Sequence, residues 1–120
     1  NLTIYARNLD KAENFVKNIE QKTSINLSAK PLQNLSDLEN TDILINATPL
    51  GTKGENENKS PIKKEIFFTA KENMIVYDLV YNPPETLFLK QAKSILTCCH
   101  YPNGKIPLSV ERSCMISSIP

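Results

Sequence analysis

Hydrophobic and polar residues follow two different periods along residues 1–94, and these periods predict alternating strands and helices. Alternating or continuous apolar segments predict strands at residues 2–6, 25–29, 42–46 and 74–78. Helical spacing and capping residues predict helices or single turns at residues 10–20, 35–39, 62–68 and 86–93. Because strands separated by helices of this length form βαβ units, we expect one α/β domain, a parallel sheet with helices on both faces.

The first predicted helix carries a start signal and an apolar face. Asp10 is expected to be its N-cap, with Glu13 three residues later completing a capping box. The residues expected on its inner face are Ala12, Phe15, Val16 and Ile19. In the segment that follows the second strand, Leu35 and Leu38 are expected to join the core.

The regular pattern ends near Ser94. Residues 95–120 have no convincing helical period, and Pro102, Pro107 and Pro120 interrupt them. We therefore divide the chain into residues 1–94, the patterned domain, and residues 95–120, a divergent carboxyl-terminal tail.

The strand at residues 42–46 ends in a small polar cluster followed by Pro49 and Gly51. In an open α/β sheet, ligands bind at the carboxyl ends of the strands, so Asn46 and Thr48 are candidate site residues. The alternative is that both side chains only satisfy the backbone of the turn. Residues 51–60 are polar and are expected to form a solvated surface loop beside the strand end, with a lid as the alternative.

Composition limits the possible partners. The chain has 120 residues, a net charge of +1 and a pI near 7.9, so no broad basic field favours nucleic acid or an anionic membrane. No apolar run approaches the roughly 20 residues of a membrane span, and the first residues do not resemble a signal peptide. We expect a cytoplasmic protein that binds a small molecule.

The three cysteines do not form a recognisable metal-binding pattern. Cys98, Cys99 and Cys114 lack C-x-x-C spacing, and the chain has a single histidine, His100. A metal site at Cys98, Cys99 and His100 would need a second pair of ligands that the sequence does not supply. We therefore expect no metal.

Three blocks of sequence together resemble the NADP-binding half of shikimate dehydrogenase. They are Ala6-Arg7-Asn8 followed by Lys11-Ala12, the turn Asn46-Ala47-Thr48-Pro49-Leu50-Gly51, and Val76-Tyr77-Asp78-Leu79-Val80-Tyr81-Asn82-Pro83 followed by Thr86 and Leu89. Their order and spacing match that family over about the first 94 residues. The resemblance implies a Rossmann-like parallel sheet that lacks its first strand.

The first block indicates NADP rather than NAD. Sites for NAD place an acidic residue after the second strand, whereas NADP sites place Arg near the added phosphate, and Arg7 stands at that position. The resemblance implies that Arg7 and Lys11 bind the 2′-phosphate and that Asn8 donates a hydrogen bond. The alternative is that Arg7 and Lys11 are solvated charges at a helix start.

The other two blocks would surround the nicotinamide. By resemblance, Asn46, Ala47 and Thr48 line the cofactor, and Leu79 and Val80 lie against its ring. Tyr81 would direct its hydroxyl toward the substrate, although its residue type alone also suits a partly buried core position. In the same block, Asp78 is expected to orient the turn.

The family reduces 3-dehydroshikimate to shikimate reversibly with NADPH, helped by a Lys and Asp pair in an amino-terminal substrate domain. These 120 residues contain neither that domain nor the Gly-rich first turn that holds the pyrophosphate, so we nominate no catalytic residue. We expect the chain alone to be inactive. Alternatives are a quinate/shikimate dehydrogenase relative and a non-catalytic nucleotide-binding remnant.

The absent first strand also has a consequence for folding. In the 3-2-1-4-5-6 strand order it lies between the strands at residues 2–6 and 42–46, so both would present an unpaired edge. We expect the chain to be marginally stable or prone to aggregation, or to pair these two strands directly.

Overall fold

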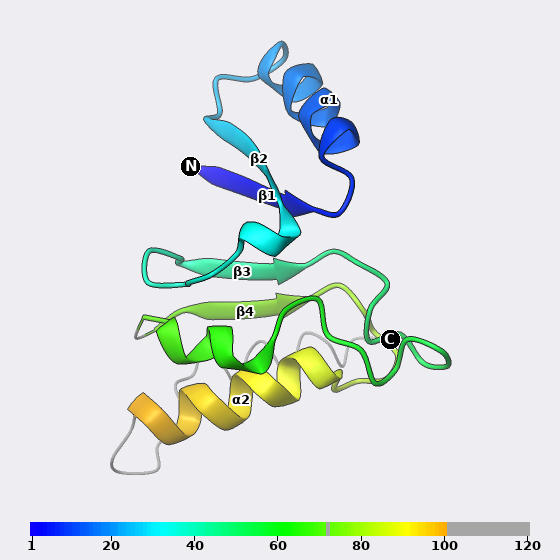
Figure 1. The fold of residues 1–120 in the computed structure, drawn as a ribbon, viewed down its shortest axis with the longest axis vertical. Helices are drawn as coiled ribbons and strands as arrows, with labels where there is room; N and C mark the ends of the chain where they lie inside the picture. The colour runs from blue at the N-terminus through cyan, green and yellow to red at the C-terminus, as the bar shows by residue number, and fades with distance from the viewer. Residues whose placement is uncertain (72, 101–120) are drawn as a thin grey trace. The chain divides into compact units, whose positions relative to one another are not determined.

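The computed structural model describes residues 1–71 and 73–100, the last four by their backbone alone. The chain divides into two units, Asn1–Ser36 and Asp37–Pro120, and the described part of each contains one pair of parallel strands (Figure 1). All four strands predicted from the sequence are present, with ends shifted by up to two residues.

The first unit is a strand–helix–strand arrangement. Its elements are strand β1 (Leu2–Ala6), helix α1 (Leu9–Glu20), strand β2 (Leu27–Pro31) and the short 3₁₀ helix η1 (Leu32–Asn34). The two strands are parallel, with Leu2 opposite Leu27 and Ala6 opposite Pro31. Because parallel neighbours need a crossover, α1 connects them as the βαβ prediction required.

Helix α1 differs from its prediction in two respects. Asn8, not Asp10, is the N-cap, since Asn8 has extended backbone angles and its side chain accepts a hydrogen bond from the helix backbone. Asp10 lies instead in the first turn, where a negative charge favours the helix dipole. Phe15 was expected on the inner face but is 54% exposed, because the buried stripe of α1 consists of Ala12 and Val16.

The segment after α1 is shifted relative to its prediction. The second strand begins at Leu27 rather than at residue 25, and it extends to Pro31. Proline is tolerated there because no described strand pairs with the other edge of β2. The helical turn predicted at residues 35–39 occurs earlier, as η1. Leu35 and Leu38 are buried, which confirms their place in the core.

The second unit positions the candidate site. Its described elements are strand β3 (Ile43–Asn46), the 3₁₀ helix η2 (Lys64–Thr69), strand β4 (Ile75–Asp78) and helix α2 (Leu87–His100). The strands are parallel and in register, so that Asn46 lies opposite Asp78 at their carboxyl ends. This pairing brings the ends of two strands, and the turns that follow them, to one edge.

The core of the second unit lies between β4, η2 and α2 (Figure 1). The rings of Phe67 on η2 and Phe88 on α2 are 5.6 Å apart between centroids, in a tilted arrangement. Leu38 reaches this core as well, and its backbone N donates to the Thr69 hydroxyl at 2.8 Å. One side of the strand pair is therefore packed against helices.

Helix α2 begins where the sequence predicts and ends later. Thr86 caps it, since its Oγ1 accepts a hydrogen bond from the backbone N of Leu89 at 3.3 Å. The helix continues to His100, so the expectation that helical structure fails after Ser94 is wrong for residues 95–100.

The extension of α2 follows from its buried face. Ile95 and Leu96 are buried and lie seven and eight residues after Phe88, the spacing that returns to the same side of a helix. Residues 101–120 and the side chains of Cys98, Cys99 and His100 lie outside the described structure. The division at residue 94 therefore stays a prediction.

The other side of the β3–β4 pair is open. Ile43 and Ile45 are 55% and 53% exposed, and Ile75, opposite Ile43, is also exposed. Among the described residues, β1 pairs only with β2, and β3 only with β4. The direct pairing of β1 with β3, one of the expected outcomes, would join the two units and stays a prediction.

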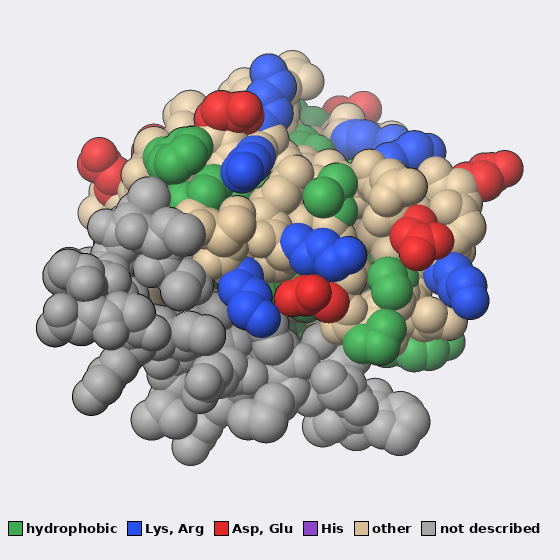
Figure 2. Space-filling model, turned by 90° about the horizontal axis from the view of Figure 1, so that it is seen from below, with side chains coloured by type: hydrophobic (Ala, Val, Ile, Leu, Met, Phe, Trp, Pro, Cys, Tyr) green, Lys and Arg blue, Asp and Glu red, His purple; other side chains and the backbone are tan. Residues whose placement is uncertain are grey.

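Charges are mixed on the visible surface. Figure 2 shows Lys, Arg, Asp and Glu side chains interspersed over the coloured part of one face, rather than gathered by sign. In the part of the chain that the structure describes, no helix is both long and apolar enough to cross a membrane.

The ion pair between Lys71 and Asp42 is expected to contribute a stability that depends on pH. A hydrogen bond from Lys71 Nζ, together with the charge of that ammonium, lowers the pKa of the Asp42 carboxyl. The stabilisation from this pair is therefore present above the ordinary pKa of Asp and is lost as pH falls through the lowered one. We expect Lys71→Ala to raise the pKa of Asp42 in an NMR titration. Lys63→Ala, which removes an exposed charge elsewhere, should leave it unchanged.

Candidate functional site

A buried hydrogen-bond network joins the carboxyl ends of β3 and β4. Asn46 is 2% exposed, and its Nδ2 donates to Asp78 Oδ1 at 3.0 Å and to the carbonyl of Leu50 at 3.1 Å. Its Oδ1 accepts from the backbone N of Thr48 at 3.0 Å and from the Thr48 hydroxyl at 2.7 Å. The Asn46 amide thus uses both donors and both acceptor positions to fix the turn after β3.

Asp78 extends the network to the second turn and to α2. Its side chain is almost fully buried; Oδ1 also accepts from the backbone N of Val80 at 2.9 Å, and Oδ2 accepts from the Thr86 hydroxyl at 2.6 Å. Thr86, which is 0% exposed, is also the cap of α2. Asp78 therefore connects the two strand ends to the start of α2. These contacts are the orienting role that the sequence predicted for Asp78.

Gly51 allows the first turn to pack against this network. Its φ is +99°, a conformation that side chains rarely adopt, and its backbone N donates to the carbonyl of Asn56 at 2.8 Å. A Cβ at this position would lie 3.1 Å from both Cβ and Cγ2 of Thr86. Glycine is therefore favoured at this position for both conformation and space.

Gly51→Ala is expected to lower the free energy of unfolding by about 2 kcal/mol, from backbone strain and the contact with Thr86. Urea denaturation followed by circular dichroism would measure it. Gly54 also has a positive φ, but a Cβ added there would meet no atom within 4 Å, so Gly54→Ala should cost less. Equal losses for the two variants would contradict the role assigned to the contact with Thr86.

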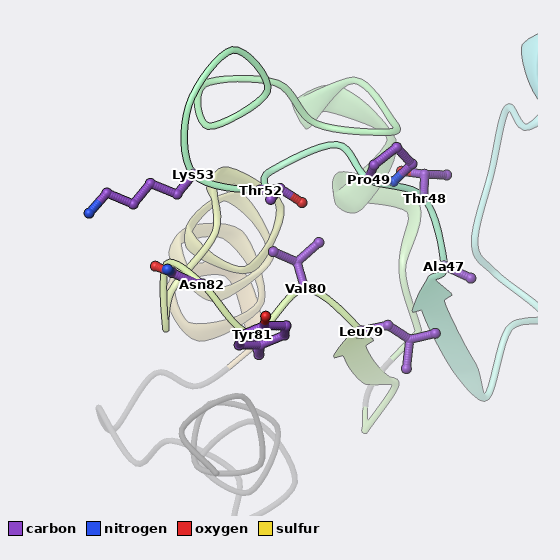
Figure 3. A pocket seen from close by; sticks show the side chains of 9 residues that line it. All are labelled: Ala47, Thr48, Pro49, Thr52, Lys53, Leu79, Val80, Tyr81 and Asn82. Carbon is purple, nitrogen blue, oxygen red and sulfur yellow. The ribbon is translucent and has the colours of Figure 1, made fainter. Parts of the chain in front are cut away.

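The two turns enclose a pocket of about 570 Å³ at the carboxyl ends of the strands (Figure 3). Its lining consists of Ala47, Thr48, Pro49, Thr52 and Lys53 from the turn after β3, and Leu79, Val80, Tyr81 and Asn82 from the turn after β4. The backbone N of Lys53 donates to the carbonyl of Asn82 at 2.9 Å, which ties the two turns together.

The lining combines apolar contact with a few polar groups. Leu79 is exposed and Val80 is buried, so they present one projecting and one packed apolar side chain. Tyr81 is 74% exposed and lies at the pocket, not in the core. The Lys53 side chain extends away from the other lining side chains (Figure 3). Such a pocket suits a flat, partly polar ring.

A second group of predicted site residues lies in the first unit. Arg7 follows the end of β1, and Asn8 and Lys11 border the first turn of α1; all three are exposed. Asn8 Oδ1 accepts from the backbone N of Lys11 at 3.0 Å, so the group it can offer to an anion is its Nδ2. Two cations and a helix start therefore occur together, a combination that suits a phosphate.

The site residues predicted for the two turns differ in whether they line the pocket. Ala47, Thr48, Leu79, Val80 and Tyr81 line one pocket, whereas the Asn46 side chain is buried beside the turn and does not line it. For Asn46, the alternative of satisfying turn backbone describes the observed contacts.

Several lining residues were not nominated from the sequence. Thr52, Lys53 and Asn82 reach the pocket through loop geometry, for which their residue types give no signal. Knowledge that β3 pairs with β4 would have indicated these residues, because it places the two turns side by side. Among the described residues, no group of three His, Cys, Asp or Glu side chains is placed to hold a metal, and the side chains of Cys98, Cys99 and His100 are outside that set.

Comparison with known proteins bears on the identity of this site. No protein-family model matches the chain. It is 40% identical over 93 residues to the shikimate dehydrogenase (NADP(+)) of Methanococcus aeolicus, an alignment that covers 78% of this chain and 32% of the relative. It is 37% identical over 97 residues to that of Methanocaldococcus jannaschii, with 79% and 33% covered.

A crystal structure of a shikimate dehydrogenase in complex with NADP+ superposes with a TM-score of 0.65 at 36% identity, over 80% of this chain and 33% of that one. The resemblance to shikimate dehydrogenase is confirmed. A shikimate 5-dehydrogenase-like protein, 19% identical, shares the fold with a TM-score of 0.57 over 98% of this chain and 46% of its own. The α/β Rossmann-like class is confirmed as well. The chain spans about a third of the length of the shikimate dehydrogenases that it matches.

Proposed function

We propose that this chain is the cofactor-binding part of an NADP-dependent shikimate dehydrogenase, which interconverts 3-dehydroshikimate and shikimate in aromatic amino-acid biosynthesis. The observation that carries the proposal is the pocket at the carboxyl ends of β3 and β4, in a chain similar to such enzymes. Ligands of open α/β sheets bind at this edge.

The residues of the pocket fit a nicotinamide ring. Leu79 and Val80 supply apolar contact, and Ala47 leaves room for a flat ring at the strand end. The Thr48 hydroxyl donates to Asn46 and accepts from the backbone N of Leu50 at 3.2 Å, so it retains one acceptor position for an amide group of a ligand. When bound, NADPH supplies the hydride for the reaction. Asn46 acts indirectly, by holding the turn.

Arg7, Asn8 and Lys11 are proposed to bind the 2′-phosphate. The Arg7 guanidinium can hold a phosphate with two parallel hydrogen bonds, and Lys11 adds a second positive charge. Asn8 contributes its Nδ2. These three residues would make the chain select NADP over NAD.

Tyr81 is proposed to contact the substrate, with its exposed hydroxyl at the edge of the pocket. The residues that carry out proton transfer are expected in the remaining two thirds of a full-length enzyme, so we expect no activity from these 120 residues alone. We also propose a cytoplasmic location, where NADP-dependent biosynthesis would take place.

Fluorescence titration of the chain with NADPH and with NADH tests this function. We expect saturable binding of NADPH and weaker binding of NADH. Absence of NADPH binding would overturn the proposal. Shikimate oxidation by the chain alone would contradict the expected inactivity, and a matching assay with quinate would then separate the two substrates.

A further inference from the structure

The strand-end network contains a buried carboxylate that has no cationic partner among the described residues. Asp78 is 4% exposed, and its two oxygens accept hydrogen bonds from Asn46 Nδ2, the backbone N of Val80 and the Thr86 hydroxyl. Within the described residues, the ion pairs join Lys71 to Asp42 and Lys93 to Glu85, so none of them neutralises Asp78.

The charge of Asp78 carries an energetic cost. Burial of a carboxylate without a cation beside it is unfavourable, even though all three of its hydrogen-bond partners are donors. In an Asp78→Asn variant, Oδ1 could still accept from Asn46 and Val80, whereas the Thr86 hydroxyl would lose its acceptor. The variant therefore removes the charge and changes one hydrogen bond of the network.

The charge lies next to the pocket. Asp78 Oδ1 is 2.9 Å from the backbone N of Val80, and Val80 and Leu79 both line the cavity (Figure 3). The oxidised nicotinamide ring carries a positive charge, and the reduced ring is neutral. A fixed negative charge in surroundings of low dielectric constant stabilises a nearby cation more than a neutral group.

We propose that Asp78 is a specificity-determining residue that makes the pocket favour oxidised over reduced nicotinamide. This inference rests on the proposed function, because it takes the pocket to be the nicotinamide site. The carboxylate acts through space, while its hydrogen bonds keep it at a fixed position behind the turn. The effect is separate from the selection of the 2′-phosphate by Arg7.

Asp78→Asn tests the inference when NADP+ and NADPH are each titrated by calorimetry against the whole 120-residue chain. We expect the variant to lose at least about tenfold in affinity for NADP+ relative to NADPH, the loss that corresponds to two charges about 12 Å apart at an effective dielectric constant of about 20. Thr86→Val is the matched control, because it breaks the same network without changing its charge. It should weaken both cofactors alike.

A second measurement does not depend on a variant. The unchanged chain is expected to bind oxidised nicotinamide mononucleotide several-fold more tightly than the reduced form, since this shorter ligand lacks the 2′-phosphate. The reverse preference would overturn the inference, and so would equal weakening of NADP+ and NADPH in Asp78→Asn, with the proposed function intact. Failure of the unchanged chain to bind either dinucleotide would overturn the proposed function and this inference with it.

Discussion

Asn46→Ala is expected to lower the free energy of unfolding by about 3 kcal/mol. The variant would leave the carbonyl of Leu50 and the donors of Thr48 without their buried partner, and Asp78 would lose one of three hydrogen bonds. A buried polar group without a partner retains its full desolvation cost, so the losses exceed those of an ordinary hydrogen bond. Urea denaturation followed by circular dichroism would measure the change.

Asn58→Ala is the matched control for Asn46→Ala. Asn58 is exposed on the loop after the first turn, so its truncation should change stability by less than about 0.5 kcal/mol. A similar loss in both variants would show that the network adds little to the stability of the second unit.

Arg7→Ala is expected to weaken NADPH binding by about 10-fold to 100-fold and to leave NADH binding unchanged. Hydrogen bonds between charged groups contribute about 1.5–3 kcal/mol, and only NADPH carries the phosphate that Arg7 is proposed to hold. Fluorescence titration of both cofactors gives the two ratios.

Lys17→Ala controls for the loss of positive charge, because Lys17 is exposed in the last turn of α1, at the opposite end of the helix from Arg7. It should leave the affinity for both cofactors within about twofold. If Arg7→Ala weakened NADPH and NADH equally, the assignment of Arg7 to the 2′-phosphate would be wrong.

The regular elements could be predicted where local chemistry determines them. Apolar patterning located β3 and β4, and Thr86 was identified as a cap because Thr is a preferred N-cap residue and stands directly before an apolar helical pattern. The start of α1 was predicted two residues late, at Asp10. Asn8 is an equally good cap residue, and its side chain accepts a hydrogen bond from the backbone N of Lys11.

The pocket could be predicted only in part, because its lining depends on how the strands pair. Ala47, Thr48, Leu79 and Val80 adjoin strand ends, so the pairing rule for parallel strands indicates them. The inward direction of Asn46 depends on its register with Asp78, which a single strand does not reveal. The helix beyond Ser94 was not predicted, because Ile95 and Leu96 form an apolar helical face only together with Phe88, seven and eight residues earlier.

The side chains at this site fall into two sets, a buried set that holds the turns and a set that lines the pocket. Asn46, Asp78 and Thr86 are buried and hold the backbone, whereas Ala47, Leu79 and Tyr81 line the cavity. Substitutions in the lining set can therefore alter which ring is accepted without reshaping the main chain beneath it. An engineer seeking a different substrate preference should vary the lining and leave Asn46 and Thr86 untouched.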